Sequence, residues 1–290
     1  MKNAYISLII SAVLYGSIST IAKPSLNSMN PILLSSLTYL IIGIFLTVFI
    51  KLTKDVVHIN KNNNLMLIFI TSVCGAVIGP ILFFYGLKLT DASISSLLIN
   101  AEFFFSILLA IIILKEKPDH LSYIGIVLIF AALIVLNFKT GVPNVFEKNN
   151  FTRNVLILTA TAFWALDNNI SKVILQQETP IIKLIQLKSL FGGVISLFIA
   201  FLFGISFSVN SYQIPNLLLL SLGGFAGSLF LFLRGMKEIG AIKSVMIFST
   251  SSLFGIIFAF VFLNESVEQW RLILSLLMII PGIYLISKNS

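Results

Sequence analysis

An aspartate and two asparagines stand in a row in the run FWALDNNISK, residues 163–172. The surrounding sequence is apolar enough for a membrane-spanning helix, and hydrocarbon is an unfavourable solvent for such groups. Asp167, Asn168 and Asn169 supply a carboxylate together with amide donors and acceptors. These groups can bind a polar solute or a counter-ion if they face the interior of a helix bundle. We therefore interpret the run as the lining of a wet cavity at the centre of such a bundle.

Lys188 lies on the next predicted span and carries a charge opposite to that of Asp167. By helical rise, Asp167 lies roughly 14 Å and Lys188 roughly 10 Å from the same face of the membrane. The turn between the two spans is short, so the spans are neighbours and we predict an ion pair. Two roles are open for it: neutralising two buried charges, or lining a solute pathway. The adjacent asparagines favour the second role.

Glu102 lies near the middle of an earlier span, roughly 15 Å from the membrane face. Its span carries no Lys or Arg between Lys88 and Lys115. A charged carboxylate at that depth costs about 3 kcal/mol, so the environment favours the protonated form. Glu102 is then either a proton-coupling group or a permanently protonated structural residue. The candidate substrate-binding or coupling residues are Glu102, Asp167, Asn168, Asn169, Lys188, Asn100, Trp164 and Tyr15.

Catalytic and metal-binding patterns are not visible in the sequence. His58 and His120 fall in predicted loops, and Cys74, the single cysteine, cannot form an intramolecular disulfide. No nucleophile with a base, no ligand set and no glycine-rich phosphate loop lies in the spans. We therefore expect no enzyme activity, no catalytic residue, no metal and no cofactor.

The chain that positions these residues has the composition of a membrane protein. Apolar residues make up 58% and charged residues 10% of it, and its mean hydropathy is +1.04. Apolar runs of roughly 18 to 24 residues recur, which is the length that crosses a bilayer as a helix. We predict ten spans, at 4–22, 31–50, 65–87, 93–114, 121–138, 153–176, 181–204, 213–234, 241–263 and 269–287.

The net charge of +8 follows from the distribution of basic residues between loops and does not require nucleic acid as a partner. With the N-terminus inside, thirteen Lys and Arg lie on the cytoplasmic side and six lie outside. The positive-inside rule therefore predicts that both termini are cytoplasmic. The abundance of Ile, Lys and Asn indicates an AT-rich prokaryotic genome, so we expect the cytoplasmic (inner) cell membrane.

The two halves of the chain resemble each other when one is shifted by 149 residues. Each half contains five spans, an odd number, so the halves enter the membrane from opposite sides. We predict an all-α membrane protein of ten transmembrane helices, arranged as two inverted five-helix repeats, 1–138 and 153–290, joined by an external linker, 139–152. Matching pairs include Lys23 with Lys172, Pro31 with Pro180, Gly75 with Gly224, Gly86 with Gly235 and Glu116 with Glu265.

The run FFYGLKLTDASISSLLINAEFFFSILLAIIILKEKPDHLSYIGIVLIFAALIVL, residues 83–136, resembles helices three to five of the drug/metabolite transporter superfamily, in its EamA-type branch. The run that begins FLRGMKEIGAIKSVMIF resembles the same element in the second half. SAVLYGSISTIAKPSLNSMNP resembles the first helix of the family, and AFWALDNNISK the sixth. The resemblance implies a ten-helix permease that moves small metabolites, often outward, without ATP. Phe103, Ser252 and Thr38 stand where the family often has proline, proline and arginine, so substrates tied to those residues are not carried over.

These observations favour a secondary transporter that works by alternating access. The sequence does not identify the solute, and its mixed charges favour a zwitterion or a neutral polar compound, such as an amino acid or a related polar compound. Export is the direction that the resemblance implies, and protons are the candidate coupling ion. The partners are membrane lipid and a small solute, and the sequence does not determine an oligomeric state. The alternative is a channel or a non-transporting scaffold, although no filter-like segment is visible. An intramembrane enzyme is the least favoured class.

Overall fold

Helices make up the regular structure of this computed structural model, which describes residues 2–53, 65–116, 120–137, 148–265 and 269–287. These described residues contain no strand. The first half contains α1 (Lys2–Ser25), α2 (Pro31–Thr53), α3 (Leu65–Val73), η1 (Cys74–Ile78), α4 (Gly79–Lys88), α5 (Ala92–Leu98), α6 (Ala101–Leu109), η2 (Ala110–Leu114) and α7 (His120–Asn137). The second half contains α8 (Lys148–Gln176), α9 (Ile181–Leu202), η3 (Ser211–Gln213), α10 (Ile214–Leu218), η4 (Leu219–Gly227), α11 (Ser228–Ile239), α12 (Ala241–Phe248), α13 (Ser251–Leu263) and α14 (Gln269–Ser287).

Seven helical runs in the described part of the chain are long and apolar enough to cross a membrane, which fits a multi-pass membrane protein. Helix α8 is not one of the seven, because its polar run lowers its hydropathy. It begins at Lys148, five residues before the start predicted from the sequence. Residues 148–152 contain neither Gly nor Pro to stop the helix. The seven runs are 3–25, 31–53, 65–88, 92–114, 181–202, 211–239 and 241–263.

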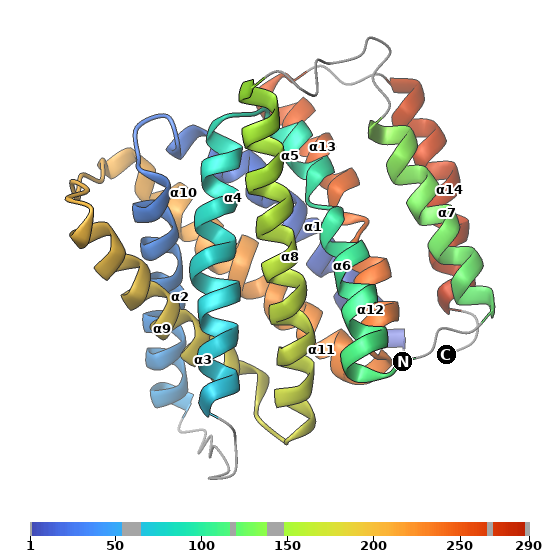
Figure 1. Ribbon diagram of the computed structural model, residues 1–290, viewed down its shortest axis with the longest axis horizontal. Helices are drawn as coiled ribbons and strands as arrows, with labels where there is room; N and C mark the ends of the chain where they lie inside the picture. The colour runs from blue at the N-terminus through green and yellow to red at the C-terminus, as the bar shows by residue number, and fades with distance from the viewer. Residues whose placement is uncertain (1, 54–64, 117–119, 138–147, 266–268, 288–290) are drawn as a thin grey trace.

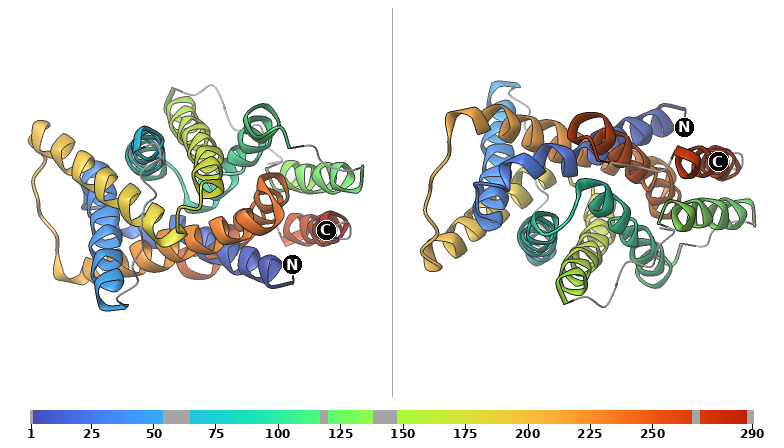
Figure 2. Two further views of the ribbon diagram at one scale, coloured as in Figure 1. Left: turned by 90° about the horizontal axis from the view of Figure 1, so that it is seen from below. Right: turned by 90° about the horizontal axis from the view of Figure 1, so that it is seen from above.

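In the view of Figure 1, helices α1 and α8 lie between the end formed by α2 and α9 and the end formed by α7 and α14. Helix α1 packs against α11 and α13, and α8 packs against α4 and α6. These partners correspond to one another in the shift of 149 residues, so the two halves exchange equivalent contacts. Helices α2 and α9 cross at one end of the bundle, and α7 lies beside α14 at the other (Figure 2).

Equivalent glycines permit the closest of these contacts. A Cβ on Gly86 would lie 2.4 Å from Ile157 Cγ1, and a Cβ on Gly235 would lie 2.5 Å from Leu8 Cγ. Helix α4 can therefore lie close against α8, and α11 against α1, only because neither glycine has a side chain. The matching pair predicted from the sequence thus marks the same packing position in both halves.

Two of the membrane-length runs are interrupted near their middle. Helices α5 and α6 are separated by Ile99 and Asn100, and α12 and α13 by Ser249 and Thr250. The backbone at both places forms hydrogen bonds between residues three apart, a tighter turn than in an α-helix. Such turns inside a helix often mark a hinge. The interruptions form here without the proline that the family resemblance led us to look for.

Candidate functional site

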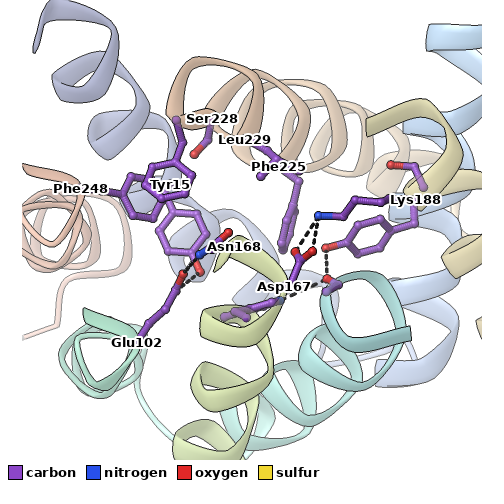
Figure 3. A pocket seen from close by; sticks show the side chains of 14 residues that line it. Tyr15, Glu102, Asp167, Asn168, Lys188, Phe225, Ser228, Leu229 and Phe248 are labelled. Carbon is purple, nitrogen blue, oxygen red and sulfur yellow. Dashed lines mark hydrogen bonds and ion pairs between the residues drawn. The ribbon is translucent and has the colours of Figure 1, made fainter. Parts of the chain in front are cut away.

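A cavity lies between the two halves, where α1, α2, η1, α6, α8, α9, η4, α11 and α12 meet (Figure 3). Its free space is about 40 Å³, which is room for a few water molecules. The charged and amide side chains in its wall are Glu102, Asp167, Asn168 and Lys188. The aromatic side chains are Tyr15, Tyr39, Trp164, Phe225, Phe232 and Phe248.

The ion pair predicted between Asp167 and Lys188 is present at one side of this cavity (Figure 3). Lys188 Nζ lies 2.5 Å from Asp167 Oδ1 and 2.6 Å from Oδ2, so it contacts both carboxylate oxygens. Ser171 Oγ donates to Oδ1 at 3.2 Å and accepts from Lys188 at 3.3 Å. Both charged residues are buried. The pair therefore contributes no net charge to the cavity.

Gly75 in η1 positions one side of the pair. A Cβ at this residue would lie 2.0 Å from Asp167 Oδ2, so the carboxylate occupies space that only glycine leaves free. The Gly75 carbonyl oxygen accepts hydrogen bonds from Tyr39 Oη at 2.9 Å and from Trp164 Nε1 at 3.2 Å. The backbone of η1 therefore holds two aromatic side chains and admits the carboxylate between them. Pro80, with no N–H to bond the carbonyl of Ala76, is the second residue of α4, the helix that follows this π-helical turn.

We expect Gly75→Ala to destabilise the protein by about 1–3 kcal/mol, because the added methyl group overpacks against Asp167. Thermal unfolding of the purified protein in detergent measures the effect. The matched control is Gly223→Ala in η4, where a Cβ would meet nothing closer than Leu219 Cδ1 at 3.5 Å. Equal losses of stability in the two variants would contradict the proposed contact with Asp167.

Glu102 lies at the opposite side of the cavity, with two neutral donors (Figure 3). Tyr15 Oη donates to Oε2 at 3.0 Å, and Asn168 Nδ2 donates to Oε1 at 2.6 Å. The Glu102 side chain is buried. Within the described residues, neither side-chain ion pair includes Glu102. One acidic group of the cavity thus has no cation beside it.

The remaining predicted site residues fall into two groups. Asn169 Nδ2 donates to the backbone oxygens of Ser106 and Ala165, so this side chain faces α6 and does not line the cavity. Asn100 lines a smaller second cavity that shares Tyr15, Glu102 and Phe248 with the first. Neither polar atom of the Asn100 side chain has a hydrogen-bond partner. The sequence had grouped all eight candidates together, and the structure brings six of them to the main cavity.

The wall of the cavity also contains aromatic residues that the sequence did not identify, namely Tyr39, Phe225, Phe232 and Phe248. The repeat supplies a signal for one of them, because Tyr39 corresponds to Lys188 in the shift of 149 residues. Tyr15 and Trp164 correspond in the same way, and their rings meet edge to face with centroids 6.1 Å apart. Equivalent positions of the two halves therefore face each other at the cavity.

Two reciprocal contacts join the halves at the ends of the interrupted runs. Glu116 accepts hydrogen bonds from the backbone N–H groups of Ala241 at 2.8 Å and Ile242 at 2.9 Å, at the start of α12. Glu265 accepts equivalent bonds from Ala92 and Ser93, both at 2.8 Å, at the start of α5. We refer to these contacts as the Glu116 clasp and the Glu265 clasp. Each places a carboxylate at a helix N-terminus, where the dipole favours negative charge.

The local backbone turns each glutamate toward the other half. Lys115 and Asn264, which precede the two glutamates, have left-handed φ values of 54° and 53°. The N–H groups of Glu116 and Glu265 bond to carbonyl oxygens six residues earlier, one residue further back than in a Schellman motif. The shift of 149 residues pairs the two glutamates, but it does not predict that each one contacts the other repeat.

Comparison with known proteins identifies the family. The model of the EamA-like transporter family matches residues 2–138 and 152–288. The chain belongs to the EamA-like transporter family. It is also 32% identical to an uncharacterized transporter of Methanothermobacter thermautotrophicus, over 99% of this chain and 86% of that protein. A solved crystal structure of another protein has a TM-score of 0.79 at 15% identity, and the match covers 100% of this chain and 98% of that one. This last likeness concerns the fold alone.

Membership of this family supports a membrane transporter and agrees with the resemblance stated from the sequence. The family model matches twice, once in each half, so this EamA-family chain contains two repeats. A membrane transporter works in lipid and on a small solute, and both are plausible partners for this protein. The family points to transport and not to catalysis.

Proposed function

We propose that the protein is a secondary active transporter that moves a small polar metabolite by alternating access, in the direction of export. The proposal rests on the buried cavity between the two repeats, which contains an ion pair, an amide and a further carboxylate. Polar groups at such depth are costly and usually belong to a solute or ion pathway. Amino acids and related polar compounds are the candidate solutes.

The proposed architecture is ten transmembrane helices in two inverted repeats, with both termini on the cytoplasmic side of the cell membrane. Reciprocal clasps support the inversion. The start of each interrupted run meets the end of the other, so the run 92–114 and the run 241–263 are antiparallel. Antiparallel equivalent elements are what an inverted repeat requires. In this orientation the Glu116 clasp lies on the cytoplasmic side and the Glu265 clasp on the outer side.

Within the cavity we assign Asp167, Asn168 and Lys188 to the solute-facing wall. The ion pair holds α8 and α9 together while it presents polar groups to the cavity. We assign Glu102 as the proton-binding group, since it has only neutral hydrogen-bond donors beside it. Proton coupling would supply the driving force for export without ATP.

Counterflow in proteoliposomes tests the transport function. Growth protection against a panel of toxic metabolite analogues, in cells that overexpress the protein, first identifies a solute. Proteoliposomes loaded with that unlabelled solute should then transiently accumulate its radiolabelled form, as a carrier requires. A channel gives flux without counterflow, and a scaffold gives no flux, so either result would reject the proposal.

We expect cysteines at Asn27 and Gln176 to react from opposite sides of the membrane. Both residues are exposed, just beyond α1 and at the end of α8, and they correspond in the shift of 149 residues. The assay uses a Cys74→Ser background and a membrane-impermeant thiol reagent on intact cells, followed by opened cells. Asn27→Cys should be labelled in intact cells and Gln176→Cys only after opening. Labelling of both from one side would contradict the inverted repeat.

A further inference from the structure

We infer that the solute carries a positively charged amine or ammonium group, and that this group and a proton take turns at Glu102. The inference rests on the proposed transport function and names the class of solute for the same cavity. One proton leaves the carboxylate as one cation binds, and the reverse happens on release. Exchange of one proton for one monovalent cation leaves the net charge of the cavity unchanged.

The charges in the wall of the cavity favour a cationic occupant. Lys188 contacts both oxygens of Asp167, so these two charges cancel. Glu102 is left as the one acidic group of the wall that has no cationic side chain beside it in the described part of the chain. A buried carboxylate needs a neutralising partner, which is either a proton or a cation. The occupant that completes this cavity is therefore positively charged.

The same charges disfavour other solutes. An anion would face the Glu102 carboxylate without a free cation to bind it. The carboxylate group of a zwitterion would need Lys188, which is already bound to Asp167 on both oxygens. Breaking that pair for each solute would leave Asp167 buried and uncompensated. A simple amine avoids both problems, so among the candidate solutes of the proposed function the cavity favours amines related to amino acids over the zwitterionic amino acids themselves.

Aromatic side chains form the wall of the cavity beside Glu102. The ring of Tyr15, whose hydroxyl group is bonded to Glu102, lies 4.6 Å from the Phe248 ring and 6.1 Å from the Trp164 ring, centroid to centroid. Phe232 continues the cluster at 4.5 Å from Phe248. Aromatic faces attract ammonium groups and exclude water. Rings beside a single carboxylate form a wall suited to an organic cation.

The side chain of Asn100 has no hydrogen-bond partner among the described residues. It is buried in the second cavity, next to Glu102, and both its amide atoms lack partners. A buried amide without partners is costly unless another molecule supplies them. A solute whose ammonium group lies at Glu102 can reach Asn100 with a hydroxyl or amide group.

The groups that face Glu102 leave it free to exchange its occupant. From α1 it meets the Tyr15 hydroxyl group, and from α8 the Asn168 amide, with the Asp167 carboxylate further away and neutralised by Lys188 from α9. From α12 the neighbours are uncharged. Neither hydrogen-bond donor is a cation, so an ammonium group displaces no like charge when it binds at Glu102.

Binding of small probes by the full-length protein tests the inference. In a Trp270→Phe background, Trp164 is the remaining tryptophan and reports on the cavity by its fluorescence. The probes are methylammonium, tetramethylammonium, glycine betaine as the zwitterion and tert-butanol as the neutral compound. We expect saturable binding of at least one of the two cations, weaker as the pH is lowered because protons occupy Glu102. Binding of the betaine or the alcohol alone, or of no probe, would overturn the inference.

The variant Glu102→Gln tests whether cation binding and its pH dependence require the Glu102 carboxylate. We expect cation binding to weaken by about tenfold or more, as for the loss of one charged contact, and to lose its pH dependence. The matched control is Glu238→Gln, because Glu238 is an exposed partner of Arg234 and should leave binding unchanged. If Glu102→Gln does not fold, the wild-type protein provides the test. In weakly buffered solution, cation binding should then release protons. Absence of proton release across the acidic range would overturn the exchange.

Flux measurements separate this inference from the proposed function. The tighter-binding cation should accumulate in proteoliposomes when a pH gradient is applied, relative to protein-free liposomes, and a membrane potential alone should not drive it. Accumulation driven by the potential would contradict the one-for-one exchange. Binding without flux would leave the solute class standing and reject transport. Counterflow of a zwitterion without cation binding would support transport and reject the cationic class of solute.

Discussion

Removing either partner of the Asp167–Lys188 pair is expected to lower the free energy of unfolding by about 3–5 kcal/mol. Lys188 is 2% exposed, and among the residues that the structure describes its ammonium group has the Asp167 carboxylate and Ser171 as its side-chain partners. Asp167→Asn therefore leaves a buried ammonium group without a negative partner. Lys188→Met leaves the carboxylate in the same position, pressed against Gly75.

The double variant Asp167→Asn with Lys188→Met should be less damaging than the sum of the two single changes, because it leaves no uncompensated charge. A double-mutant cycle on chemical or thermal unfolding in detergent measures the difference. The exposed pair Arg234 and Glu238 on α11 is the control, and its cycle should give about 0.5 kcal/mol or less. Additivity within about 0.5 kcal/mol at Asp167 and Lys188 would mean that the pair has no energetic role.

Much of the fold was predictable because hydropathy and repeat spacing are local properties of the sequence. The predicted ranges agree with the helices to within a few residues, as for Ala241–Leu263. The start of α8 at Lys148 was not predicted, because the sequence gives no stop signal between the apolar span and its polar extension. The ion pair was predictable from the depths of Asp167 and Lys188 in the membrane. Two helices joined by a short turn are neighbours, so residues at similar depth lie side by side.

The parts of the site that depend on helix rotation and long-range packing were not predictable. Asn169 follows Asn168 directly, yet one faces α6 and the other bonds to Glu102. The sequence does not show which neighbouring helix each face of α8 meets. It therefore cannot distinguish the roles of the two asparagines. Phe248 and Phe232 are two of 26 phenylalanines, and nothing in their spacing distinguishes a cavity wall from a lipid-facing surface.

The Glu116 clasp and the Glu265 clasp show which part of the long-range packing can be inferred from the sequence. The shift of 149 residues pairs Glu116 with Glu265 and Ala92 with Ala241. Those four residues are the ones that meet across the repeats. The repeat identifies which residues of the two halves are equivalent. Only the structure shows that each of the two carboxylates binds the helix start in the opposite half.

Glu116→Gln and Glu265→Gln are expected to shift the transporter in opposite directions. The two clasps lie at the two ends of the run 92–114, roughly 33 Å apart by helical rise. Hydrogen bonds to a charged group contribute about 1.5–3 kcal/mol each, so weakening one clasp shifts the balance between the two open states by about tenfold or more. Glu116→Gln should favour the state open to the cytoplasm, and Glu265→Gln the state open to the outside.

The accessibility of one buried residue from each side measures this shift. Ser228 lies in the cavity wall and is 1% exposed, so Ser228→Cys in a Cys74→Ser background reacts with an impermeant thiol reagent only when a path opens. The reaction from the cytoplasmic side should accelerate in Glu116→Gln, and the reaction from the outside in Glu265→Gln. Glu238→Gln serves as the control for loss of a surface carboxylate. Because each clasp joins both repeats at one end only, a structural role without gating would change the two rates alike, and such parallel changes would refute the assignment.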